Sequence, residues 1–408
     1  MIKMKILEYK TISDIPGFQT TGIHCGIKKS GKKDLCIIYS EKPAVSAATF
    51  TTNKVKAAPL LINMEHIHAQ NTQAIVVNSG NANACTGPKG LEDAMTMAEV
   101  TANALGLSSQ EVLVGSTGII GVPMPMHMIT PGIEAACSML SKNNGDHAAE
   151  AIMTTDTFTK KITVEFMIGD KPVLISGIAK GSGMIHPNMG TMLGFIATNI
   201  HITKSLLTSA LKDSVENSYN MVSIDGDTST NDMVIALANG TAENPLIYNM
   251  NGYYMQFKKA LDFVNQELAK MIAKDGEGAT KLIQTSVINA KTLEDAKLCA
   301  KSVMSSNLVK SAFFGSDANW GRIMCSLGYS SGNFSPEKVD IFFKNTTKAI
   351  QLVQDGIGMP FSEEIAKTIL EQDHVDIIID LKDGNHQATA WGCDLSYDYI
   401  KINGTYRT

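Results

Sequence analysis

The sequence predicts a mixed α/β fold, and three observations support that prediction. Short apolar runs such as Ala74-Ile75-Val76-Val77 are bounded by turn-forming residues, as buried strands are. A long helix over about 253–274 is predicted by apolar residues at four- and three-residue steps, namely Phe257, Leu261, Val264, Leu268 and Met271. With 408 residues, of which 44% are hydrophobic and 18% charged, the chain is large enough for two lobes with a sizeable core.

The other helices and strands are predicted from the same kinds of pattern, helical steps and short apolar or alternating runs. A helical pattern covers about 91–104. Apolar or alternating runs predict strands at 74–77, 111–114, 162–166, 173–178, 192–197 and 377–379. Polar residues and glycines should end the first two strands, Asn78-Ser79-Gly80 after one and Gly115-Ser116-Thr117-Gly118 after the other.

Charge argues against a nucleic-acid-binding surface. The formal net charge is −5 and the isoelectric point is near 6.0, whereas such proteins carry clustered positive charge. The basic clusters at 28–33 and at Lys160-Lys161 are short, so solvated turns are expected there.

Cysteine usage and hydropathy indicate the cytoplasm. The seven cysteines are scattered and form no C-x-x-C pair, which favours reduced thiols over disulfides or zinc sites. The amino end lacks the apolar core of a signal peptide. No apolar stretch is long enough for a membrane span, so none is expected.

One segment carries a candidate nucleophile. Residues 180–193 place Thr191 after the small Gly190 and before an apolar run, as a self-cleaving precursor requires. The Thr191 hydroxyl would attack the Gly190 carbonyl, and an N-to-O acyl shift followed by hydrolysis would split the chain. The new amino-terminal Thr191 would then hold a nucleophile and a base in one residue. Spacing alone favours the alternative, a β-branched strand residue.

Seven blocks of sequence bear on that choice: KGSGMIHPNMGTMLGF (180–195), FTTNKVKAAP (50–59), VVNSGNANACTG (76–87), VGSTGIIG (114–121), DGDTSTND (225–232), GSDANWGR (315–322) and INGTYRT (402–408). Together they resemble the ornithine acetyltransferase family, the autocleaving glutamate N-acetyltransferases of arginine biosynthesis. The blocks occur in the family's order from about residue 50 to the last residue.

The resemblance implies a layered sheet-and-helix sandwich with two interlocked lobes. It also implies cleavage between Gly190 and Thr191, which gives an α chain of residues 1–190 and a β chain of residues 191–408. The carboxyl-terminal lobe would begin roughly at residue 281, and the fragments would stay together as an α2β2 heterotetramer. Gly190 stands where the family commonly has alanine, so cleavage is expected to survive while its rate is open.

Acyl transfer also needs donors for a tetrahedral oxyanion. The turn expected at 115–118 would aim backbone N–H groups and a hydroxyl at one point. The resemblance assigns this role to Thr117 and Gly118. The alternative is an ordinary glycine-rich turn.

The substrates carry an α-carboxylate and, in ornithine, a side-chain ammonium. Lys180, eleven residues before Thr191, is the natural partner for the carboxylate. Glu277 lies between two glycines and would pair with the ammonium. The resemblance adds substrate contacts at Thr154, Thr191, Asn403 and the terminal Thr408. The alternatives are a surface lysine, a turn glutamate and a frayed tail.

No metal and no cofactor are expected. Residues 225–231 resemble the start of a calcium loop, but Thr230 replaces its glycine and Ala236 its glutamate, so a turn supporting the site is expected. His186 lacks an evident carboxylate partner and is expected to be structural. His66 and His68, alternating on a strand at most, are weak evidence for a metal.

These observations lead to one hypothesis with two rivals. The hypothesis is an acyltransferase that moves acetyl from N2-acetylornithine to glutamate through an acetyl-Thr191 ester by ping-pong kinetics. Some family members also use acetyl-CoA as donor, and that remains open here. One rival is an autocleaving amidase or aminopeptidase, which would pass the acyl group to water. The other is a non-catalytic binding protein, whose chain would stay intact.

Overall fold

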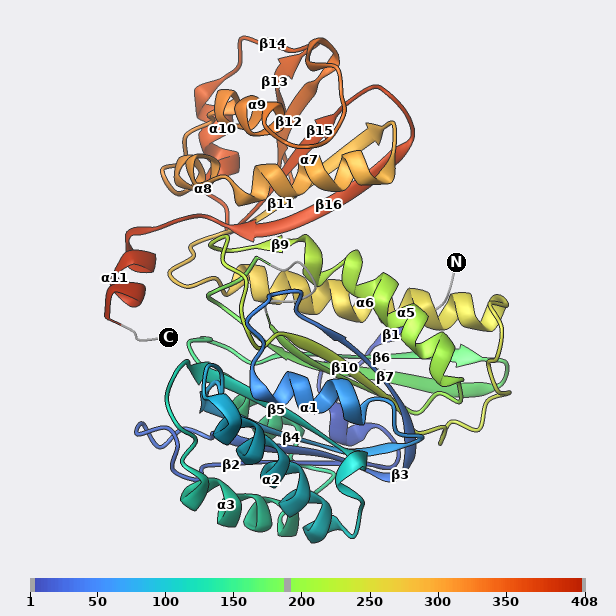
Figure 1. The fold of residues 1–408 in the computed structure, drawn as a ribbon. Helices are drawn as coiled ribbons and strands as arrows, with labels where there is room; N and C mark the ends of the chain where they lie inside the picture. Colours follow the sequence, from blue (N-terminus) through green and yellow to red (C-terminus); the bar gives the residue numbers. More distant parts are fainter. Residues whose placement is uncertain (1–3, 187–191, 406–408) are drawn as a thin grey trace.

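The computed structural model describes residues 4–186 and 192–405. Figure 1 shows two lobes, each built on a β-sheet with helices packed against it. Within the described residues the lower sheet has nine strands and the upper sheet seven. The predicted α/β class is therefore confirmed.

The lower sheet has the order β1-β6-β7-β8-β10-β3-β4-β5, with β2 paired to β3. Its strands are β1 (Met4–Ile6), β2 (Phe18–Ile23), β3 (Leu35–Phe50), β4 (Thr72–Asn81), β5 (Val112–Ile119), β6 (Lys160–Ile168), β7 (Lys171–Lys180), β8 (Leu193–Thr198) and β10 (Met233–Ala238). The upper sheet has the order β14-β13-β12-β15-β11-β16-β9. Its strands are β9 (Val222–Ser223), β11 (Leu282–Ala290), β12 (Asp340–Lys344), β13 (Ala349–Gln354), β14 (Ile357–Gly358), β15 (His374–Asp380) and β16 (His386–Cys393).

The helices are distributed over both lobes. They are α1 (Ala58–His66), α2 (Gly87–Leu105), α3 (Met126–Ser138), α4 (Gly145–Ala151), α5 (Lys204–Glu216), α6 (Gly252–Lys274), α7 (Leu293–Ser305), α8 (Asn307–Phe314), α9 (Trp320–Gly328), α10 (Glu363–Leu370) and α11 (Tyr397–Thr405). No helix in the described ranges is both long enough and apolar enough to cross a membrane.

Helix α6 joins the two lobes. Its side chains pack on β6 and β7 below and on β11 and β16 above. The predicted apolar stripe includes Phe257, Leu261, Val264 and Leu268, all fully buried. The Asn251 side chain caps its start by accepting from the Tyr254 N–H. The helix predicted at 253–274 is thus confirmed, and its carboxyl end lies at the junction between the lobes (Figure 1).

Strand β8 lies between β7 and β10, and its pairing register with them determines which strand ends lie side by side. Lys180, the last residue of β7, pairs with Leu193, the first of β8. Leu193 also pairs with Met233, the first residue of β10. The segment after β7, the residue before β8 and the loop before β10 therefore meet at one edge of the sheet.

The predicted ends of two strands are wrong. Strand β4 continues through Asn78-Ser79-Gly80, and β5 continues through Gly115–Gly118 instead of breaking into a turn. Parallel pairing explains this, because Ser79 lies opposite Thr117 and Gly80 opposite Gly118. The Ser116 hydroxyl also donates to Asn78 Oδ1 at 2.6 Å across the two strands. Polar residues of turn-forming type stay in a strand where the neighbouring strand satisfies them.

Gly22 in β2 tests how tightly α4 packs. A Cβ added there would lie 1.9 Å from the His147 carbonyl oxygen. We expect Gly22→Ala to lower the free energy of unfolding by about 1–3 kcal/mol, since overpacking forces the backbone apart. The control is Gly328→Ala at the end of α9, where nothing lies within 4 Å. Urea unfolding should show a lower midpoint for Gly22→Ala only, and equal midpoints would contradict the packing.

Candidate active site

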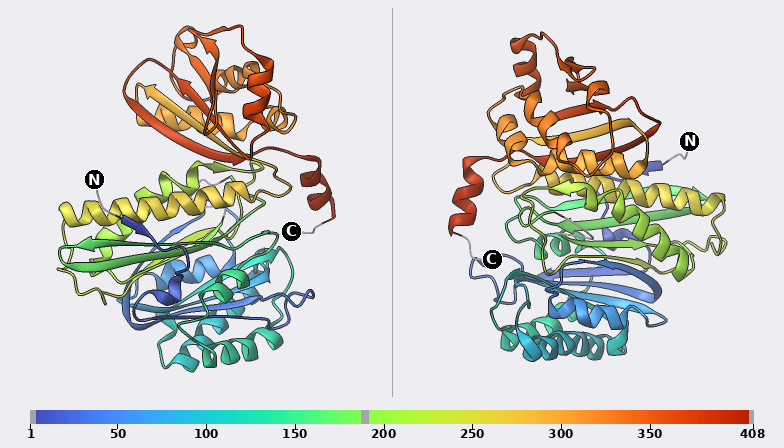
Figure 2. Two further views of the ribbon diagram at one scale, coloured as in Figure 1. Left: turned by 180° about the vertical axis from the view of Figure 1, so that it is seen from behind. Right: turned by 45° about the horizontal axis from the view of Figure 1, so that its top comes forward.

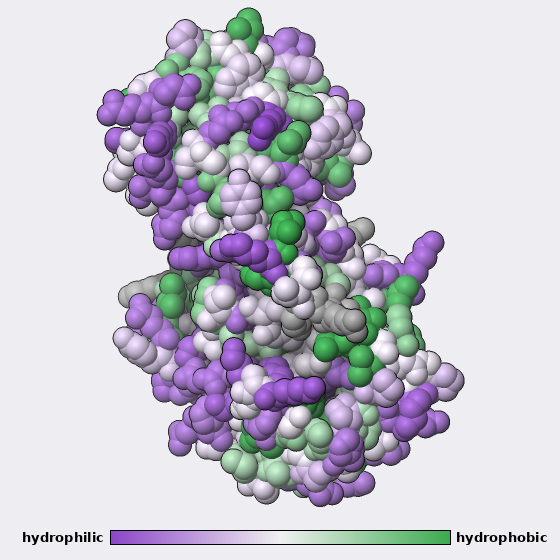
Figure 3. All heavy atoms as spheres, turned by 90° about the vertical axis from the view of Figure 1, so that its left-hand side faces the viewer, coloured by the Kyte–Doolittle hydropathy of each residue, from purple (hydrophilic) through white to green (hydrophobic). Residues whose placement is uncertain are grey.

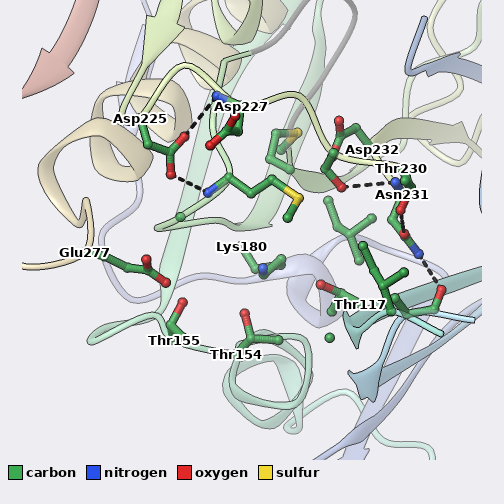
Figure 4. Close-up of a pocket in the computed structure, with 18 of the residues that line it drawn as sticks. Thr117, Thr154, Thr155, Lys180, Asp225, Asp227, Thr230, Asn231, Asp232 and Glu277 are labelled. Carbon is green, nitrogen blue, oxygen red and sulfur yellow. Dashed lines mark hydrogen bonds between the residues drawn. The ribbon is translucent and has the colours of Figure 1, made fainter. Parts of the chain in front are cut away.

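A pocket opens at the sheet edge where β5 and β7 end and β8 begins. It is lined by six residues singled out in the sequence, Thr117, Gly118, Thr154, Lys180, Glu277 and Asn403. Figure 4 shows the side chains of Thr117, Thr154, Lys180 and Glu277 around one cavity. Gly190, Thr191 and Thr408 lie outside the described residues. Met192, which follows Thr191, lines the same pocket.

Lys180 provides a buried side-chain cation in the pocket. Its side chain lies in the pocket with the residue only 8% exposed. No hydrogen bond or ion pair joins its ammonium to another residue of the described ranges. Burial lowers the pKa of Lys180, and the nearby Asp156 carboxylate opposes that effect. A buried cation without a partner is suited to an anionic ligand such as a carboxylate. The alternative of a surface lysine is therefore wrong.

Thr117 and Gly118 occupy the end of β5 at the pocket wall. Gly118 has φ +136°, which favours glycine, and an added Cβ would lie 2.3 Å from the Gly80 carbonyl carbon. Asn231 fixes the backbone beside them, because its Nδ2 donates to the oxygens of Ala82 at 2.6 Å and Ser116 at 2.8 Å. The two residues thus sit on a rigid strand end, which suits preorganised donors.

Glu277 and Asn403 meet although 126 residues separate them. Asn403 Nδ2 donates to Glu277 Oε2 at 2.7 Å, and the Glu277 N–H donates to the Ser182 oxygen at 2.8 Å. Asn403 belongs to α11, which leaves β16 and descends beside the lower lobe (Figure 2). The alternative of a frayed tail is therefore wrong for Asn403. Figure 3 views the side of the molecule on which α11 lies and shows the narrowing between the lobes.

The Thr154 segment closes another side of the pocket. The Thr154 N–H donates to Asp156 Oδ2 at 2.9 Å. The next residue, Thr155, shares a hydrogen bond of 2.7 Å between its hydroxyl and that of Ser182. Thr154 itself lines the pocket, so its hydroxyl is available to a ligand.

The 225–232 loop holds the chain upstream of Thr191. Asp225 accepts hydrogen bonds from the Met184 N–H at 2.6 Å and the Ile185 N–H at 2.7 Å. Ile185 also pairs with Thr228 in an isolated bridge. Burial raises the pKa of Asp225 above its usual value. Both carboxylate oxygens serve backbone amides, as expected for a supporting turn.

Hydrogen bonds inside the protein hold the rings of His186 and His66. Burial lowers the pKa of His186 to about 4, so its ring is neutral near pH 7 and shares a 3.0 Å hydrogen bond with Ser223. His66 ends helix α1, so the strand alternation with His68 is wrong, and its ring nitrogen donates to the Val112 oxygen at 2.8 Å.

Sequence reasoning missed the place of several residues in or near the pocket. Lys160, expected in a solvated turn, is fully buried between Asp156 and Asp275, so that expectation is wrong. Asp227 and Tyr399 also line the cavity. For Lys160, its partner Asp156 stands four residues before it and was the one local clue, whereas its partner Asp275 lies 115 residues away and left no local signal.

Comparison with known proteins adds the family. Residues 19–408 match the model of the ArgJ family. An "arginine biosynthesis bifunctional protein ArgJ 1" from Clostridium acetobutylicum is 58% identical and covers 100% of both chains. An "arginine biosynthesis bifunctional protein ArgJ" from Bacillus subtilis is 47% identical over 97% of this chain and 96% of its own.

A solved structure was also found. The structure of an ornithine acetyltransferase complexed with ornithine from Mycobacterium tuberculosis is 36% identical, covers 46% of this chain and 99% of that chain, and has a TM-score of 0.43. The family match spans most of the chain and the Clostridium relative spans all of it. This chain therefore belongs to the ArgJ family.

Proposed function

We propose that this chain is the acyltransferase of arginine biosynthesis that moves an acetyl group from N2-acetylornithine to glutamate. The products are ornithine and N-acetylglutamate. The observation that carries the proposal is the meeting of six family-matched residues in one pocket, beside the residue that follows Thr191. Those residues lie as far apart in sequence as Thr117 and Asn403.

Maturation is proposed to begin at Thr191. Its hydroxyl attacks the Gly190 carbonyl, the acyl group shifts from nitrogen to oxygen, and water hydrolyses the ester. The products are an α fragment, 1–190, and a β fragment, 191–408, with its carboxyl-terminal lobe from roughly residue 281. Asp225 supports this step by holding Met184 and Ile185, and the pairing of β8 holds the chain just downstream.

Transfer then takes two steps. The Thr191 hydroxyl attacks the acetyl carbonyl of N2-acetylornithine while the Thr191 α-amine accepts the hydroxyl proton. Thr117 and Gly118 stabilise the oxyanion, and the proton passes to the departing ornithine amine. The glutamate amine next attacks the acetyl-Thr191 ester, and the threonine hydroxyl recovers its proton. One C–N bond breaks and one forms, so ping-pong kinetics follow.

Substrate recognition follows from the charges of the pocket. Lys180 would bind the α-carboxylate shared by both substrates, because its ammonium has no partner among the described residues. Glu277 would bind the ornithine ammonium, held in place by Asn403. The Thr154 hydroxyl and Thr408 complete the proposed contacts.

The assembly and location are proposed from the resemblance and composition. The two fragments would form an α2β2 heterotetramer in the cytoplasm, where reduced thiols suit the scattered cysteines. The chemistry needs no cofactor. Acetyl-CoA is proposed only as a second acetyl donor at Thr191.

Thr191→Ala should abolish both maturation and transfer. Without the hydroxyl neither ester forms, so kcat should fall by about a thousandfold or more. Intact mass under denaturing conditions should show one 43.9 kDa chain for the variant. The unaltered protein should give fragments of roughly 20 and 23 kDa, the whole mass divided in proportion to residues 1–190 and 191–408. Thr191→Ser, which keeps a hydroxyl, is the matched control, and a processed, active Thr191→Ala variant would contradict the mechanism.

Lys180→Met should weaken transfer with both substrates. Removal of the cation leaves the α-carboxylate unpaired, so kcat/KM for each substrate should fall by about tenfold or more. Steady-state kinetics with each substrate varied in turn provides the measurement. Unchanged constants for both substrates would remove Lys180 from the site.

Glu277→Gln should affect the KM values of the two substrates differently. The ornithine ammonium loses its charge partner, so KM for N2-acetylornithine should rise by about tenfold while KM for glutamate changes less. Gln keeps an oxygen for Asn403, which limits structural damage. Equal changes in both KM values would indicate a general structural role instead.

A further inference from the structure

Three charged side chains form an ion cluster behind the pocket, which we call the charge triad: Asp156, Lys160 and Asp275. Lys160 Nζ donates to Asp156 Oδ1 at 2.7 Å and to Asp275 Oδ2 at 2.5 Å. The side chains of Asp156 and Lys160 are 0% exposed and that of Asp275 is 2% exposed. Burying charges is unfavourable unless they are paired, and replacing such clusters with apolar residues often stabilises a protein. Stability alone therefore does not account for the triad.

Asp156 ties two walls of the pocket together. Its Oδ2 accepts from the Thr154 N–H at 2.9 Å, and its Oδ1 accepts from the Gly181 N–H at 2.7 Å. Thr154 lines the pocket, and Gly181 directly follows Lys180. One carboxylate therefore sets the distance between the Thr154 segment and the end of β7.

Asp275 ties in the third wall. It lies just after helix α6 and two residues before Glu277. Its Oδ2 accepts from the Thr157 N–H at 3.0 Å, and its Oδ1 accepts from the Thr157 hydroxyl. Lys160 then joins Asp275 to Asp156, so the segments that bear Thr154, Lys180 and Glu277 share one buried centre.

We propose that the charge triad is the positioning device of this pocket, and that Asp156 supplies the negative charge that keeps Lys180 a cation for binding carboxylates. None of the triad's three residues is among the described residues that line the pocket, so we treat them as positioning residues. The inference rests on the proposed function only in taking Lys180 as the carboxylate-binding residue.

The charges facing Lys180 support the second half of the proposal. They are Asp156, Lys160, Asp232, Glu277 and Lys28. Burial lowers the pKa of Lys180, whereas Asp156 is the strongest of the charges that raise it and Lys160 lowers it. Burial also acts to raise the pKa of Asp156, but Lys180 and Lys160 outweigh it and hold that pKa well below its usual range. Asp156 thus stays ionised at any working pH.

The test is the pH profile of kcat/KM for N2-acetylornithine, measured on mature enzyme. The informative part is its alkaline limb, the decline of kcat/KM at high pH. Transfer should need protonated Lys180 and decline as pH rises through its pKa. Asp156→Asn removes the favourable charge, so the limb should move to lower pH by about one unit or more. Lys160→Met removes an unfavourable charge, so the limb should move to higher pH. Substitution of the two partners of one ion pair would then shift the pH profile of kcat/KM in opposite directions, which structural damage alone does not do.

Asp275→Asn is the matched control. It also breaks a buried contact to Lys160, but within the described residues Asp275 accepts hydrogen bonds from Lys160 and Thr157, whereas Asp156 accepts one from the Gly181 N–H next to Lys180. Its thermal unfolding temperature should fall while its alkaline limb stays where it is in the unaltered enzyme. If Asp156→Asn does not fold, the Lys160→Met variant alone tests the inference: its alkaline limb should move to higher pH.

Limbs that stay fixed in the active Asp156 and Lys160 variants, or that move in the same direction, would overturn the inference. If the unaltered enzyme showed no acetyl transfer from N2-acetylornithine to glutamate, the proposed function itself would be overturned.

Discussion

The pairing of β8 with β7 on one side and β10 on the other is the constraint on which the site depends. This register places Lys180, Leu193 and Met233 side by side at one edge of the lower sheet. The loop before β10 then reaches across that edge, and Asn231 joins it by hydrogen bonds to Ala82, just after β4, and to Ser116 in β5. A shift of one residue would turn every side chain of β8 to the other face of the sheet, so the buried strand fixes the register strongly.

Charge burial is the second organising feature. The side chains of Asp156, Lys160 and Lys180 are all buried, and electrostatic interactions between buried groups are stronger than in water. Lys160 has its charge satisfied by two carboxylates, whereas Lys180 has no ion-pair partner among the residues described. This contrast separates a lysine that organises structure from one that is available to a ligand.

Much of the fold and site could be predicted from the sequence, for identifiable reasons. The stripe of α6 follows a 3.6-residue period that the sequence displays directly, and the helix lies within one residue of its predicted start. The grouping of Thr117, Lys180 and Glu277 came from motif resemblance, since no local pattern joins them. The continuation of β5 through Gly115–Gly118 was missed because pairing with β4 overrides turn propensity. The burial of Lys160 was missed because two adjacent lysines are typical of a solvated turn and because its second partner, Asp275, is distant in sequence.

The proposed function depends above all on the passage of acetyl through Thr191. The most direct measurement is the mass of the β fragment after mature enzyme is mixed with N2-acetylornithine without glutamate and quenched in acid. We expect a gain of about 42 Da, one acetyl group, on the peptide that begins at Thr191, and its loss when glutamate is added before the quench. An unmodified fragment under conditions of active transfer, or an acetyl group on another residue, would contradict the claim.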